Sequence, residues 1–195
     1  MKAVAIVVAA PTALILPASG AAGPSPAPFN ITDGPNGALV VNGNGDDNAL
    51  SVFYGDGTTP RFEISPEDET ISESSSHCTP SGTFPDRIIF CDYDVDRFLL
   101  KFGGGEDVSN FTSGADPWPG AVKLIVNGGS GDDVLRGADG DDTIKGAADA
   151  DKLIGKNGSD KLIAKDGTKD RVINCGTGND PAARVDPEDP KPKSC

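Results

Sequence analysis

The chain has few of the residues on which many enzymes and nucleic-acid-binding proteins depend. It contains one histidine, His77, which excludes the H-E-x-x-H signature of zinc proteases. Lys and Arg number 17 against 30 Asp and Glu. The formal net charge of −13 argues against nucleic acid as a partner, because that binding needs basic side chains to neutralise phosphates. Aromatic residues make up only 6%, which favours small repeated core layers over one thick core.

Other catalytic signatures are missing as well. The run Gly128-Gly129-Ser130-Gly131 lacks the glycine phase of the G-x-S-x-G nucleophile turn. The glycine runs do not satisfy G-x-x-x-x-G-K-[ST], so a phosphate-binding loop is excluded. We therefore expect a protein that is not an enzyme.

The long apolar run of the sequence lies at its N-terminus. Met1-Lys2 precedes an apolar stretch from Ala3 to Pro17, and small residues follow it. This stretch is shorter than the roughly 20 residues of a membrane-spanning helix. Residues 1–22 are thus predicted to be a signal peptide of a secreted protein without a membrane span. The Pro-rich residues 23–30 are predicted to be a linker.

Four cysteines follow, and none of them forms a C-x-x-C motif, which argues against a zinc knuckle or a thioredoxin-like site. Their spacing favours the pairs Cys78–Cys91 and Cys175–Cys195, since local closure is the simplest of the three connectivities. Each disulfide would stabilise the fold by about 3 kcal/mol through chain entropy.

In the region 31–127, short apolar stretches alternate with Gly, Asp, Asn and Pro, and no stretch shows helical periodicity. An all-β region is expected. The acidic segment Ser65 to Ser76 is predicted to be a surface loop. Strands are predicted at residues 38–41, 50–54, 87–90, 98–102 and 121–126.

From Gly128 the chain repeats every nine residues: GGSGDDVLR, GADGDDTIK, GAADADKLI and GKNGSDKLI. The eighth residue of each is Leu or Ile, and beyond the fourth repeat the spacing of the aspartates loosens to ten. Residues 128–173 are assigned to the repeats and 174–195 to a C-terminal cap. The sixth residues, followed by their looser continuation, are Asp133, Asp142, Asp151, Asp160, Asp170 and Asp180.

The period has a physical interpretation. The glycine-rich six residues suit a turn and the last three suit a short strand, with the eighth residue directed inward. Two nonapeptides make one coil of the chain, so repeat n stacks on repeat n+2 in a parallel β-solenoid. Stacked aspartates repel each other unless a cation lies between them. Carboxylates with turn carbonyls suit Ca²⁺ better than Mg²⁺, and softer metals would need His or Cys.

The repeats resemble the RTX (hemolysin-type) calcium-binding nonapeptide G-G-x-G-x-D-x-U-x of secreted bacterial proteins. The first repeat matches every defined position. The other three lack glycine at the second position, and the third also lacks it at the fourth. The resemblance implies a parallel β-roll with Ca²⁺ between stacked turns. It places one ion between Asp133 and Asp151 and another between Asp142 and Asp160. A third, between Asp151 and Asp170, stays open because Lys169 takes the expected carboxylate position. The further implied ligands are the carbonyls of Gly129, Gly131, Gly140 and Gly158, with Asp149 as an added carboxylate.

The G-x-G-x-D turn also occurs more weakly outside the array. It ends at Asp47, at Asp107 and at Asp180. These copies favour one continuous solenoid, in which residues 31–127 form a divergent leading part.

Three functions are compatible with the sequence. The first is extracellular Ca²⁺ binding without catalysis, with folding coupled to the metal. The second is a metal-free structural or adhesion solenoid, and the third is a secreted hydrolase or toxin with an RTX tail. A disordered acidic linker is disfavoured, because disorder does not require the aliphatic eighth position to keep phase. No protein or cell-surface partner can be named from the sequence.

Overall fold

The computed structural model describes residues 29–55, 61–66, 71–73, 75–81, 88–92, 95–113 and 122–195. The predicted signal peptide and residues 23–28 of the predicted linker lie outside this part of the chain. The described residues form strands and one short 3-10 turn, Pro35–Gly37, and they include no α-helix. The expected all-β class is confirmed.

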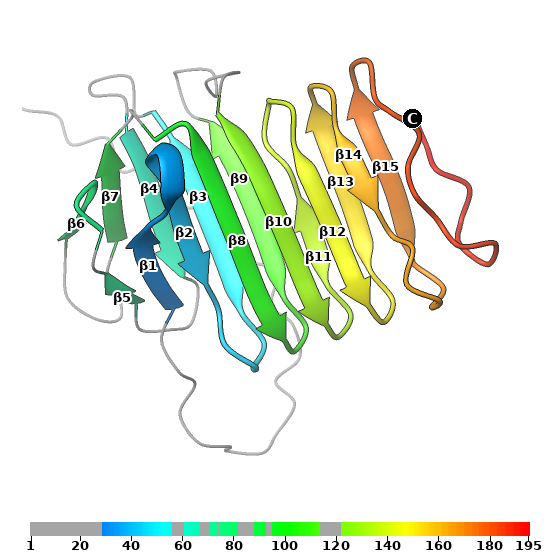
Figure 1. Cartoon of the computed structure of the whole chain (residues 1–195), viewed down its shortest axis with the longest axis horizontal. Helices are drawn as coiled ribbons and strands as arrows, with labels where there is room; N and C mark the ends of the chain where they lie inside the picture. The colour runs from blue at the N-terminus through cyan, green and yellow to red at the C-terminus, as the bar shows by residue number, and fades with distance from the viewer. Residues whose placement is uncertain are drawn as a thin grey trace, which may run out of the picture.

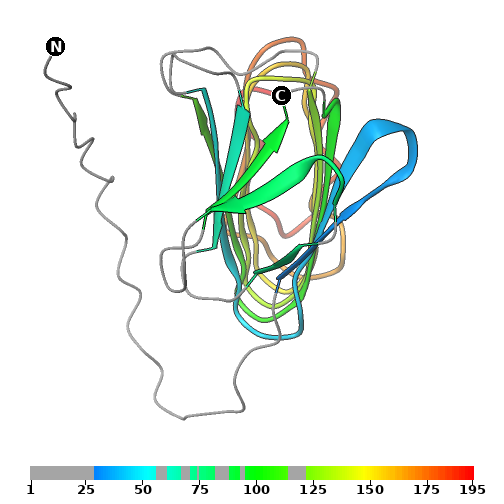
Figure 2. The same ribbon diagram turned by 90° about the vertical axis from the view of Figure 1, so that its left-hand side faces the viewer.

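Two mostly parallel sheets lie face to face, as Figures 1 and 2 show. Sheet one has the order β14 (Lys161–Ile163), β12 (Thr143–Ala148), β10 (Lys123–Ser130), β8 (Arg97–Gly104), β2 (Ala38–Asn42), β1 (Phe29–Asp33) and β5 (Ile71–Glu73). Sheet two has the order β15 (Val172–Thr177), β13 (Lys152–Asn157), β11 (Val134–Arg136), β9 (Val108–Ser113), β3 (Ala49–Tyr54), β4 (Arg61–Pro66), β7 (Ile88–Asp92) and β6 (Cys78–Ser81).

From β8 onward the chain alternates between the sheets, and from β10 to β15 each strand pairs in parallel with the strand two before it. We call one strand of sheet one, the next strand of sheet two and the turn between them a rung. Ile144 pairs with Val126 before it and Leu162 after it. Repeat n therefore stacks on repeat n+2, as the period predicts. The later ten-residue spacing keeps the register, because Leu153 pairs with Ile173.

The core between the repeat strands is thin and aliphatic. Leu135, Ile144, Leu153 and Leu162 are fully buried, whereas Lys145 on the outer face is exposed. Burial of the eighth position follows from strand alternation, which sends neighbouring side chains to opposite faces. Burying each such side chain stabilises the fold by about 1.5–3 kcal/mol.

Aromatic side chains gather at the other end of the sheets. The ring of Phe62 lies 4.9 Å from those of Tyr54 and Phe98, measured between centroids. Here β1 pairs with β2, β3 with β4, and β7 with β4 and β6, all antiparallel. These strands end the parallel stack. The leading region is continuous with the repeats, because β2 pairs with β8 and β3 with β9.

The predicted strands are found, although residues 87 and 121 lie outside the described part. Two predicted boundaries are wrong. The linker ends earlier than residue 30, because β1 begins at Phe29 and that side chain is 1% exposed. The predicted loop from Ser65 to Ser76 contains the end of β4 and all of β5, which pairs with β1. Its end is also held, because the backbone N–H of Ser76 donates to Oδ2 of Asp33 at 2.9 Å.

Both predicted disulfides are present. Cys78–Cys91 joins β6 to β7, and Cys175–Cys195 joins β15 to the last residue. The C-terminal tail runs beside the last strands (Figure 1), where Arg184 bridges to Ile163 and Lys193 to Asn174. It therefore extends both sheets by one partial layer. No helix among the described residues is long and apolar enough to span a membrane.

Candidate metal centre

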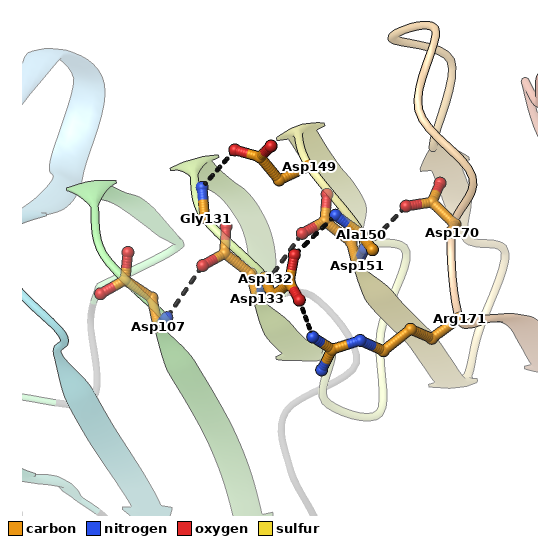
Figure 3. Close-up of polar contacts among 9 residues, drawn as sticks. All are labelled: Asp107, Gly131, Asp132, Asp133, Asp149, Ala150, Asp151, Asp170 and Arg171. Atoms are coloured by element: carbon orange, nitrogen blue, oxygen red, sulfur yellow. Dashed lines mark hydrogen bonds and ion pairs between the residues drawn. The ribbon is translucent and has the colours of Figure 1, made fainter. Parts of the chain in front are cut away.

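The turns from sheet one to sheet two stack along one edge of the molecule, which we call the first edge. The carboxylate of Asp133 reaches back one rung, and its Oδ1 accepts the N–H of Asp107 at 2.8 Å (Figure 3). Asp151 does the same to Asp133 at 2.9 Å, and Asp170 to Asp151 at 2.8 Å. We call this row, Asp107–Asp133–Asp151–Asp170, the first ladder.

The turns from sheet two back to sheet one form the second edge. There, Oδ1 of Asp160 accepts the N–H of Asp142 at 2.9 Å, and Oδ1 of Asp180 accepts the N–H of Asp160 at 2.7 Å. We call the row Asp142–Asp160–Asp180 the second ladder. The pairs Asp133–Asp151 and Asp142–Asp160, which the sequence predicts to share ions, are therefore neighbours in the fold.

The second oxygen of these carboxylates is mostly left without a partner. The Oδ2 atoms of Asp133, Asp151 and Asp170 are buried and accept no hydrogen bond from any described residue. The same is true of Asp160 and Asp180. A buried charged oxygen without a partner is costly, and such atoms in a native fold call for an ion or water.

Burial also changes the acidity of the ladders. It raises the pKa of Asp133 to about 6 and that of Asp151 to about 7, against an opposing hydrogen bond from the backbone of the previous rung. Carboxylates nearby add to the rise, among them Asp132 for the first residue and Asp170 for the second. The ladder therefore concentrates negative charge that a cation would relieve.

The first glycine of each repeat provides room for the carboxylate. A Cβ atom at Gly128 would lie 1.9 Å from Oδ2 of Asp133, and one at Gly146 would lie 1.9 Å from Oδ2 of Asp151. Neither glycine has a positive φ. The repeat pattern suggests that these glycines are needed for a positive φ, but they do not adopt one. They are needed because a side chain there would occupy the space of the carboxylate.

The second and fourth positions supply backbone carbonyls. Gly129 and Gly131 have φ of 127° and 113°, and Cβ atoms there would meet carbonyl oxygens of the previous rung. Ala147 and Asp149 take the same positions in the third repeat and keep φ of 94° and 77°. The stack imposes the conformation on these two residues, although their side chains disfavour it.

The doubled aspartates of the repeats have two different roles. Asp133 reaches back to the N–H of Asp107, whereas Asp132 reaches forward, and Oδ1 of Asp132 accepts the N–H of Ala150 at 2.9 Å. Asp141 likewise accepts from Ser159. The N–H of Ala150 lowers the pKa of Asp132, and an exposed ion pair with Arg171 lowers it further.

The structure settles several residues that the sequence left open. Asp170, rather than Lys169, continues the first ladder, so the chain does slip by one residue there. In the leading region Asn48 takes the ladder position and donates its N–H to Asp107 at 2.8 Å. Asp47 instead accepts the N–H of Glu106, so its predicted equivalence to the sixth position is wrong by one residue.

The predicted ligands Asp149 and Gly140 are not members of the ladders, and each lies against a glycine of a neighbouring rung. Asp149 accepts the N–H of Gly131 at 3.0 Å, at the rim of the first edge (Figure 3). The carbonyl of Gly140 lies against Gly158. Sequence reasoning missed Asp189, whose Oδ1 accepts the N–H of Asp170 at 2.9 Å. No repeat signal marks it, because it lies in the tail.

No three His, Cys, Asp or Glu side chains of the described residues converge as a preformed metal cluster. Side chains alone thus do not complete a site, and any ion at a ladder must draw on backbone carbonyls. Hard cations such as Ca²⁺ accept carbonyl oxygens in that way.

A family model for the RTX calcium-binding nonapeptide repeat, in four copies, matches residues 127–162. Residues 127–162 are therefore similar to RTX repeats. The match covers less than a fifth of the chain and stops before Asp170. No curated protein and no solved structure matches the chain.

The residues present fit the metal that RTX repeats imply. The Oδ2 atoms without a partner among the described residues supply anionic oxygen. The space beside these atoms stays free because glycine, which has no side chain, lies next to them. The repeats contain no His or Cys, so the metal-binding atoms that they offer are oxygens. Oxygen ligands suit calcium and disfavour softer metals. The same geometry continues past the match to Asp170.

Proposed function

We propose that this protein binds Ca²⁺ outside the cell through its RTX repeats, without catalysing a reaction. The observation that carries the proposal is the row of buried carboxylates in the first ladder, each with one oxygen bonded to the previous rung. The second oxygen of Asp133, Asp151 and Asp170 has no partner among the described residues.

Backbone geometry and charge together favour calcium over a proton or a monovalent ion. Calcium takes six to eight oxygens at about 2.3–2.6 Å in flexible geometry, which carboxylates and turn carbonyls of two rungs can provide. Between Asp133 and Asp151, the carbonyls of Gly129 and Gly131 are the expected neighbours. Sites of extracellular modules bind at about 10⁻⁴–10⁻³ M, which suffices where calcium is abundant.

We further propose that the two stacked sheets form a β-roll whose repeats order when the metal arrives. Without calcium, the ladder buries repelling carboxylates with raised pKa values, such as Asp151 at about 7. Metal binding would remove that repulsion, and binding energy then becomes folding energy. The apolar N-terminal run and the disulfides support secretion.

Circular dichroism against calcium tests this function. We expect the wild type to gain β-structure signal as calcium rises through the millimolar range. The double variant Asp133→Asn/Asp151→Asn should need more calcium, since two anionic ligands are lost. A flat response up to about 10 mM, roughly ten times the weakest expected affinity, would contradict the proposal.

Two controls separate the alternatives. Magnesium at the same concentrations should give a weaker response, because it demands octahedral geometry and keeps its water. A response equal to that of calcium would point to charge screening alone. A metal-free scaffold would show no response to either ion, and a screen for hydrolase activity on the same sample tests the toxin-like alternative.

A further inference from the structure

The turns of the second edge carry a half-buried lysine, Lys156. It occupies the second position of the fourth repeat, where the repeat pattern has glycine, and it keeps the glycine-like φ of 87°. Its side chain runs back past Ala138 of the previous rung, and Nζ donates to the carbonyl of Phe111, one rung further back. An ammonium group thus lies at the upstream end of the second edge.

The charged groups near each ladder aspartate also set the start of the second ladder apart. The charges that act most strongly on Asp133, Asp151, Asp160 and Asp170 all belong to other carboxylates. Asp142, the first member of the second ladder, has Lys156 as well as Asp160 near it. Asp139, on the same turn, also attracts the ammonium.

Asp142 itself differs from the other ladder residues. Both of its oxygens have partners, because Oδ1 accepts from Leu124 at 2.9 Å and Oδ2 accepts from Ala138 at 2.8 Å. In its turn, neither Ala138 nor Gly140 has a positive φ, whereas Lys156 and Gly158 one rung later both do. The turn next to the ammonium therefore lacks the carbonyl arrangement of the other turns.

We propose that Lys156 is a resident cation, which takes the place of one calcium ion at the upstream end of the second edge. The inference rests on the proposed calcium binding. The ammonium donates to a backbone carbonyl of one rung, and its charge acts on the carboxylates of Asp139 and Asp142 in the next, which are the kinds of group that calcium would bind. The second edge then begins to bind calcium only downstream of this lysine, and the two edges hold different numbers of ions.

The space beside the lysine supports this exchange. Lys156 lines a pocket of about 210 Å³ with Phe111, Thr112, Ser113, Ala138 and Asp139. Without the lysine side chain, the Phe111 carbonyl and the carboxylate of Asp139 would face open volume, with Asp142 buried behind them. Carboxylate oxygens that already accept one hydrogen bond keep a second lone pair for a metal.

Native mass spectrometry of the whole protein in calcium tests the proposal. Lys156→Gly, which restores the repeat residue and removes the ammonium, should bind one more calcium ion than the wild type. The matched control is Ala147→Gly, which restores glycine at the same repeat position on the first edge without changing the charge. Its ion count should equal that of the wild type. An unchanged count in Lys156→Gly would overturn the proposal, whereas the absence of calcium from the wild type would overturn the proposed function instead.

A second pair of variants covers the case in which Lys156→Gly folds poorly. Lys156→Met keeps most of the side chain and loses the charge, and Lys145→Met removes the same charge from an exposed site. In chelator-treated protein at pH 8, only Lys156→Met should melt at a lower temperature, because Asp142 loses its counter-charge. Equal melting of the two variants would show that the lysine serves packing alone.

Discussion

At the scale of single residues, the repeat aspartate makes a separable contribution through each of its two oxygens. In Asp133, Oδ1 supports the previous rung and Oδ2 has no partner among the described residues. Asn keeps an acceptor for the N–H of Asp107 and replaces the free oxygen with an uncharged group. We predict that Asp133→Asn lowers calcium affinity at least about ten-fold, or 1.4 kcal/mol, in isothermal titration calorimetry.

The control for this change is Asp46→Asn, which removes the same charge from an exposed turn. Its calcium affinity should stay within about two-fold of the wild type, since screened surface charges act weakly at distance. If both variants lost affinity equally, net charge rather than the ladder would hold the ion.

Residues forced into the left-handed region give a second prediction at this scale. Ala147 has φ of 94°, in a position where the first repeat carries Gly129. A non-glycine residue in such a conformation costs about 1–2 kcal/mol. We expect Ala147→Gly to raise the free energy of unfolding by about 1 kcal/mol in urea titrations with saturating calcium. A loss of stability would show that the methyl group is worth more than the strain.

At the scale of elements, the C-terminal tail protects the last strands of both sheets. It pairs with Ile163 and Asn174, and the Cys175–Cys195 disulfide holds its end. Replacing both cysteines with Ser should destabilise the protein by about 3 kcal/mol in the chain-entropy estimate. Thermal unfolding measures this loss, and size-exclusion chromatography should show self-association through exposed strand edges. Unchanged melting would show that the tail docks without the disulfide.

Strand prediction succeeded where apolar alternation was strong and failed where polar residues point inward. β9 was missed because its inward position Ser109 is polar, although it is fully buried and bonded to the backbone of Arg136. β5 was missed because its neighbours are acidic and serine-rich. The pairing of repeat n with repeat n+2 was predictable, since a fixed period leaves one register that buries every eighth residue.

The candidate site was only partly predictable for a related reason. The sixth-position aspartates follow from the period, and the sequence therefore identifies Asp133 and Asp151. The direction in which each carboxylate reaches depends on stacked backbone groups that no local pattern encodes. Asp132 and Asp133 are identical in sequence terms, yet one reaches forward and the other back. Asp189 joins the first ladder only because the tail folds back.

At the scale of the whole molecule, the ladders make calcium-free stability depend on pH. The pKa of Asp151 rises from 3.8 to about 7, and that of Asp133 to about 6. Between the unfolded pKa of 3.8 and these raised pKa values, the folded chain binds more protons than the unfolded chain. The free energy of unfolding therefore falls as pH rises from about 4 to 7. We predict that chelator-treated protein melts at a higher temperature at pH 5 than at pH 8.

Calcium should reverse this dependence, because protons compete with the metal for the same carboxylates. The rise in melting temperature on adding calcium should be larger at pH 8 than at pH 5. A calcium effect independent of pH would mean that the raised-pKa aspartates are not ligands. Differential scanning fluorimetry in matched buffers measures all four conditions.

The central claim is that calcium lies between stacked aspartates of the first ladder. Crystals grown with calcium and measured at a wavelength where calcium scatters anomalously test it most directly. The account predicts an anomalous peak between Asp133 and Asp151, within about 2.3–2.6 Å of carboxylate and turn-carbonyl oxygens. A map with the repeats ordered and no peak at this ladder, or with peaks only at exposed carboxylates, would contradict it.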